Sequence, residues 1–239
     1  MTMKKIAITI LTAPLVGIMT ASAGEEVVPV TAPSSCACVP YFGISYVDGE
    51  QSLISQSYDV SGLRFVGGVD LGNGYSVDAR YEKLSGDFPD FISETQTQFR
   101  DLDSDELRIL LNRDFELSET LNLFGGIGYG WRDALLDTPL GSLSVSGDGV
   151  LANLGLEFST GHYFASLVYT HCFTQNIDVS GLGFGSPNLK KEDFGYLEAT
   201  VGYDITEQLA ATLAYECNVY GDQYLEKDHV IAIGLNYSF

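Results

Sequence analysis

The strongest constraint on this chain is a two-residue alternation of side-chain character that returns ten times along it. In the last of these segments, 229–239, large apolar side chains alternate with small or polar ones up to the final residue. A period of two is the pattern of a β-strand with one apolar face. The ten segments predicted as strands are 39–48, 60–71, 75–84, 105–115, 121–132, 149–158, 162–173, 194–204, 209–220 and 229–239.

The connections between these segments alternate in length. Short connections are predicted at 72–74, 116–120, 159–161 and 205–208, and longer loops at 49–59, 85–104, 133–148, 174–193 and 221–228. Short turns on one side and longer loops on the other, joining strands of roughly 9–12 residues, are features of a membrane-spanning barrel. We therefore expect residues 39–239 to form an all-β, closed, antiparallel transmembrane β-barrel of ten strands, with eight as the alternative count. Both termini are expected on the periplasmic side.

The N-terminal residues have the pattern of an export signal. Lys4 and Lys5 precede an apolar stretch over 6–19, and Ala21-Ser22-Ala23 fits a cleavage site. Residues 1–23 are thus predicted to be a secretory signal peptide. Residues 24–38 are predicted to be a periplasmic linker before the barrel.

The C-terminal strand places its large side chains on one face and ends on an aromatic residue. Such a strand resembles the closing strand of bacterial outer-membrane β-barrels, here of the small OmpA/OmpX/Ail-like, porin-family grouping. The resemblance implies a Gram-negative outer-membrane location, contact with the lipid bilayer and lipopolysaccharide, and recognition of this strand by the outer-membrane assembly machinery. The residues that carry it are Ile231, Ile233, Leu235, Tyr237 and Phe239.

A soluble barrel shows the same alternation with its faces reversed, apolar inside and polar outside. Three features favour the membrane version. The polar faces are rich in glycine, which a narrow lumen needs and a solvated sheet does not. The apolar faces carry aromatic side chains near both ends, as bilayer interfaces require. No charge lies in the middle of an apolar face; Arg113 lies at a strand end.

The faces predicted to point into the lumen carry both signs of charge. Unpaired charges in a confined space are costly, so we expect them to pair. One interpretation is an arginine–carboxylate network that plugs the lumen; the other is a slim water-filled path with an acidic surplus that prefers cations. The residues of this predicted network are Arg64, Asp78, Arg80, Glu82, Glu106, Arg108, Arg132, Glu157, Glu198 and Glu216.

Charge and motifs exclude several function classes. Without residues 1–23 the chain has a net charge of about −22, which excludes nucleic-acid binding through a basic patch. The acidic run 101–106 lacks the glycine and the terminal glutamate of a calcium loop and is interpreted as a solvated acidic rim. Omptin-type proteases are ten-stranded barrels too, but the likeness stops at strand number. No catalytic residue, metal or cofactor is predicted.

Three functions follow from this pattern. The first is a structural or surface-interaction barrel with a plugged polar lumen that displays five extracellular loops to an unknown ligand. The second is a narrow, cation-preferring diffusion channel. The third is a hydrolase at the outer rim, for which His171 and His229 are the candidate bases.

Overall fold

The computed structural model describes residues 38–53, 56–93, 96–138, 141–181, 193–221 and 225–239. It confirms a closed, all-antiparallel barrel of ten strands. The predicted signal peptide and linker residues 24–37 lie outside the described residues, as do 182–192 of the predicted loop 174–193. The strands are β1 (Val39–Leu53), β2 (Gln56–Gly72), β3 (Tyr75–Ser93), β4 (Gln96–Ser118), β5 (Leu121–Thr138), β6 (Gly141–Thr160), β7 (Tyr163–Gly181), β8 (Phe194–Asp204), β9 (Leu209–Tyr220) and β10 (Leu225–Ser238).

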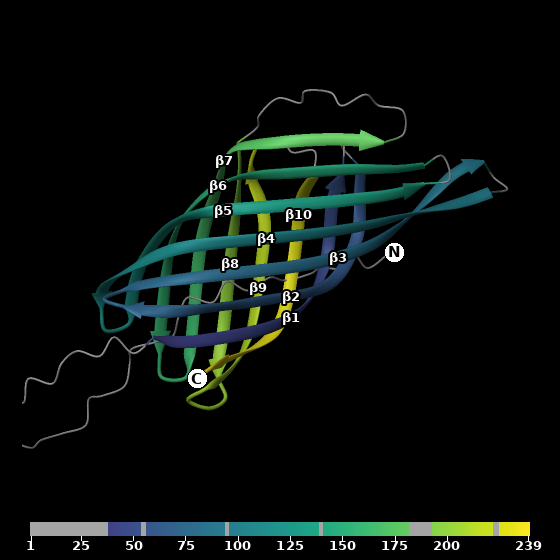
Figure 1. The fold of residues 1–239 in the computed structure, drawn as a ribbon. Coiled ribbons are helices and arrows are strands. Elements are labelled where there is room, and N and C mark those ends of the chain that lie inside the picture. The colour runs from purple at the N-terminus through teal and green to yellow at the C-terminus, as the bar shows by residue number, and fades with distance from the viewer. Residues whose placement is uncertain (1–37, 54–55, 94–95, 139–140, 182–192, 222–224) are drawn as a thin grey trace, which may run out of the picture.

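Each strand pairs with its neighbours in the chain, and β1 pairs with β10 to close the cylinder (Figure 1). At the closure Phe42 lies opposite Tyr237 and Ile44 opposite Leu235. Four short turns and both ends of the barrel chain lie at one end, which we call the short-turn end. The opposite end, where β1–β2, β3–β4 and β5–β6 form long hairpins, is the hairpin end. No helix in the described part of the chain is long and apolar enough to cross a membrane.

The large apolar side chains point out of the cylinder, as predicted for the membrane version. Ile233 is 64% exposed while its neighbour Ala232 is fully buried. Aromatic side chains near the short-turn end are exposed on the outer face, at Phe42, Tyr75, Phe115, Phe158, Tyr163, Tyr203, Tyr237 and Phe239. Rings from adjacent strands contact one another there; the Tyr163 and Tyr203 centroids, for example, are 5.1 Å apart. An apolar outer surface bordered by aromatic rings fits a bilayer.

The strands extend further at the hairpin end than the sequence predicted. Segments 49–59, 85–104 and 133–148, expected to be loops, are mostly strand, and β4 alone runs for 23 residues. The acidic run 101–106, interpreted as a rim loop, lies within β4: Asp101 and Asp103 are exposed, whereas Leu102 is 1% exposed. The two-residue alternation therefore continues beyond the part of the barrel whose outer surface is apolar. There the polar side chains point outward into water and the apolar side chains point inward and pack. The β3–β4 hairpin projects furthest in Figure 1.

Candidate functional site

The interior contains a compact group of paired charges, which we call the charged layer. All of its side chains are nearly inaccessible, from 0% exposed for Arg64 and Glu216 to 7% for Glu106. Eight of its nine members belong to the predicted network. The layer consists of Arg64, Arg80, Arg108, Arg132 and Lys227 with Glu82, Glu106, Glu198 and Glu216.

Strand register places like charges directly opposite one another in this layer. Arg80 of β3 faces Arg108 of β4, and Glu198 of β8 faces Glu216 of β9. Like charges directly opposite on a sheet are destabilising. They are tolerated here because each carboxylate also meets a cation from another strand, as when Arg80 donates to Glu198 at 2.8 Å.

Several of these ion pairs cross the lumen. Arg108 of β4 donates to Glu216 of β9 at 3.2 Å, and five strand steps separate β4 from β9 around the ten-stranded cylinder. Arg80 of β3 also donates to Glu216. These contacts join opposite walls of the barrel, so the charged layer blocks the lumen at its level.

Lys227 is the member of the layer that the sequence did not predict. Its ammonium group is 2.5 Å from Glu106 and also contacts Glu82, with Glu216 at 3.7 Å. Sequence analysis placed it in the loop 221–228. Its inward direction depends on a bulge in the β1–β10 ladder, where Gln51 pairs with Lys227 after Glu50 pairs with His229. A bulge inserts one extra residue and reverses the alternation beyond it.

An apolar cluster, which we call the apolar cap, packs beside the charged layer, and most of it lies on the hairpin side of that layer. Its residues on β2 to β5 follow the charged residues of the same strands toward the hairpin end; Leu84, for instance, comes two residues after Glu82. Each is at most 5% exposed. The cap comprises Val47, Leu53, Tyr58, Val60, Leu84, Leu102, Ala134, Leu136, Leu143, Val145, Val179, Ala214, Val230 and Ala232.

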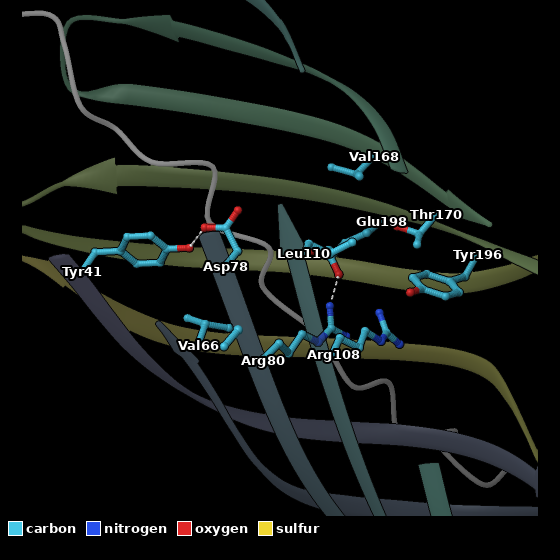
Figure 2. A pocket seen from close by; sticks show the side chains of 11 residues that line it. Tyr41, Val66, Asp78, Arg80, Arg108, Leu110, Val168, Thr170, Tyr196 and Glu198 are labelled. Atoms are coloured by element: carbon cyan, nitrogen blue, oxygen red, sulfur yellow. Dashed lines mark hydrogen bonds and ion pairs between the residues drawn. The ribbon is translucent and has the colours of Figure 1, made fainter. Parts of the chain in front are cut away.

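A cavity of about 20 Å³ borders the charged layer, room for one or two water molecules. Figure 2 shows Asp78 and Tyr41 at one end of it and Tyr196 at the other, with Arg80 and Arg108 between. The Arg108 guanidinium lies 4.1 Å from the centroid of the Tyr196 ring. The Tyr196 hydroxyl is buried without a hydrogen-bond partner among the described residues.

Two residues of the predicted network lie outside the charged layer. Asp78 is nearer the short-turn end, where it accepts hydrogen bonds from Tyr41, Asn112 and, at 3.1 Å, Ser76. Glu157 is also inward-facing and only 6% exposed, but no described residue contacts its carboxylate with a hydrogen bond or ion pair. These two residues therefore lie apart from the charged layer, because they are displaced along the strands toward the short-turn end.

Of the two histidines proposed as rim bases, His229 lies on β10 opposite Glu50 of β1 and Cys217 of β9. His171 lies on β7. The Nδ1 atom of His171 lies 2.9 Å from the Tyr169 hydroxyl, and its ring packs on Phe173 with centroids 4.3 Å apart. It belongs to the aromatic surface on the outside of β7.

Comparison with known proteins supports the fold only. No protein-family model and no curated protein matches the chain. Among solved structures, the translocator domain of the autotransporter NalP from Neisseria meningitidis aligns with a TM-score of 0.51 at 14% identity, covering 87% of this chain and 90% of that one. This chain has the fold of a bacterial outer-membrane β-barrel.

Two further structures align over most of this chain. The outer-membrane protease OmpT from Escherichia coli has a TM-score of 0.50 at 9% identity, with 86% of this chain and 98% of that chain covered. Ail from Yersinia pestis has a TM-score of 0.41 at 13% identity, with 84% of this chain and 99% of that chain covered. The bacterial outer-membrane β-barrel fold that the sequence predicted is confirmed by the alignments with NalP and OmpT.

Proposed function

We propose that this protein is a closed outer-membrane barrel that serves a structural or surface-interaction role through its projecting hairpins. The observation that carries the proposal is the interior stack of charged layer and apolar cap. Ten strands enclose a narrow lumen, since open aqueous channels are found at about 16–18 strands. The ion pairs of the charged layer join opposite walls, and the apolar cap packs against that layer. Together they fill the lumen, so we expect no open path for a solute.

Planar-bilayer recording tests the closed lumen. The purified protein, inserted at the same amount as a general porin, is expected to give no unit currents over a range of salt concentrations. The variant R80A/E216A removes a pair that crosses the lumen and leaves the apolar cap in place, so it is expected to remain silent too. Steady, salt-dependent unit currents from the wild-type protein would establish the narrow-channel alternative and overturn this proposal.

The orientation of the barrel is part of the same proposal. Outer-membrane barrels have short periplasmic turns and longer extracellular connections. The long hairpins here support an extracellular hairpin end, with the turn at 205–208 and both ends of the barrel in the periplasm. An epitope inserted after Thr138 should be labelled by antibody on intact cells, whereas the same epitope after Thr206 should require permeabilised cells. The reverse result would overturn the orientation.

A catalytic role is not part of the proposal. A general base needs a carboxylate or equivalent group to orient it and a polar space for substrate. His171 instead has a tyrosine hydroxyl and aromatic rings as neighbours on the outer face of the barrel.

A further inference from the structure

One arginine on the outer wall of the barrel differs from the other basic side chains that the structure describes. Arg113 is exposed on β4 at the short-turn end, and its contacts are with the aromatic residues Tyr75 and Phe115. Within the described ranges no carboxylate forms an ion pair with it. Every other described basic side chain is paired with a carboxylate: Arg64, Arg80, Lys83, Arg108, Arg132 and Lys227. In so acidic a chain, the charge of Arg113 is thus left for an anion from outside the protein.

Two aromatic rings hold the Arg113 guanidinium in place. Its central carbon is 4.6 Å from the centroid of the Tyr75 ring and 5.2 Å from that of Phe115. One guanidinium N–H also donates to the Tyr75 hydroxyl, which leaves the other N–H donors of the side chain unused. The Tyr75 hydroxyl accepts this bond, and its own proton has no acceptor among the described residues. Arg113 and Tyr75 therefore present N–H and O–H donors at one place on the outer surface.

These donors suit a phosphate group. A guanidinium is planar and can bind two phosphate oxygens with parallel hydrogen bonds, and a hydroxyl beside it can reach a third oxygen. Arg113 lies among the exposed aromatic side chains of the short-turn end, which mark the bilayer interface. Lipid headgroups lie at that depth, so the phosphate that Arg113 meets there is the phosphate of a lipid.

The wall beside Arg113 has room for the acyl chains of such a lipid. Gly125 of β5 lies directly opposite Arg113 and has no side chain to cover it. Leu154 of β6 lies on the other side of Gly125 and is exposed. Leu111 and Ile127 follow on the outer face toward the hairpin end, and both are exposed. A shallow apolar surface thus leads from the arginine toward the middle of the barrel wall.

We propose that Arg113 and Tyr75 bind the phosphate of one glycerophospholipid, whose acyl chains lie on the outer wall over Gly125 and Ile127. In the proposed orientation this lipid belongs to the periplasmic leaflet. The site depends on the barrel lying in a membrane and is independent of whether its lumen conducts and of what its hairpins bind.

Native mass spectrometry tests the site, because it counts lipids that stay bound when the folded protein is released from a non-ionic detergent. The probe is dioleoylphosphatidylglycerol, and dioleoylglycerol has the same acyl chains without the phosphate. Inorganic phosphate is added as a competitor in a third set of samples. R113Q removes the charge at the site, and Y75F removes the hydroxyl alone. K83Q is the matched control, since the Lys83 side chain is also on the outer face and is 56% exposed.

The wild-type protein and K83Q are expected to retain one phosphatidylglycerol more than R113Q, and Y75F should retain less than the wild type. Dioleoylglycerol should show no difference among the four proteins. If R113Q folds poorly, Y75F and the comparison of the two lipids on the wild-type protein decide the question.

Equal retention of phosphatidylglycerol by the wild type and both site variants would overturn the site. An equal loss in K83Q would also overturn it, because binding would then depend on overall charge. Complete displacement by inorganic phosphate would assign the site to free phosphate instead of a lipid.

Discussion

Replacing Lys227 by methionine tests the charged layer most directly. The substitution keeps the length and apolar stem of the side chain and removes the charge that contacts Glu82 and Glu106, with Glu216 close by. Removing one partner from a buried ion pair costs about 3–5 kcal/mol. Each of these glutamates keeps at least one arginine, for example Arg108 at 3.2 Å from Glu216, so the low end applies. We expect K227M to lower the free energy of unfolding by about 3 kcal/mol.

The matched control is K83M. Lys83 is also a lysine near a carboxylate, Asp105 at 3.5 Å, but its side chain is 56% exposed on the outer face. Surface pairs contribute about 0–1 kcal/mol, so K83M should change little. The assay is reversible urea unfolding in detergent or lipid vesicles, followed by tryptophan fluorescence and gel mobility. Equal effects of K227M and K83M would refute the argument that Lys227 is buried between three carboxylates.

Three further predictions concern the wall of the barrel. Ile233→Arg, on the outer face of β10, should destabilise the barrel in vesicles by about 2–4 kcal/mol, as measured by urea unfolding. Asp133→Arg, at an exposed position in the hairpin-end part of β5, should not lower stability in the same assay. Gly74→Ala should lower stability by about 1–2 kcal/mol in the same assay, because Gly74 has a φ of 75°. The emission of Trp131, the only tryptophan, should be quenched by brominated lipids, since it lies on the outer face among the aromatic side chains; an unquenched signal would contradict that position.

Alternation predicted the barrel because the membrane imposes it. Across the apolar band every strand must place large apolar side chains outside, so a period of two with aromatic ends was sufficient to find ten strands. The rule fails beyond the band. There Asp101 and Asp103 face water and Leu102 faces inward. This part of β4 therefore has the acidic composition expected of a loop, although it forms a strand.

The interior was predicted less well than the wall. Sequence analysis identified which arginines and glutamates point inward, because direction follows from alternation. It did not identify their partners, which depend on register and on the curvature that brings β4 opposite β9. Lys227 was missed because residues 221–228 were expected to be a loop, whereas β10 begins at Leu225, and the bulge between His229 and Lys227 turns Lys227 inward.

The ion pairs that cross the lumen have a consequence for assembly. Arg108 and Glu216 sit on strands half a circumference apart, and more than a hundred residues separate them in the chain. An incompletely curled sheet holds these groups far from each other, so their attraction contributes only when β10 docks on β1. Joining that last seam should consequently be the strongly favourable event in biogenesis, and intermediates with an open seam should be short-lived and readily degraded.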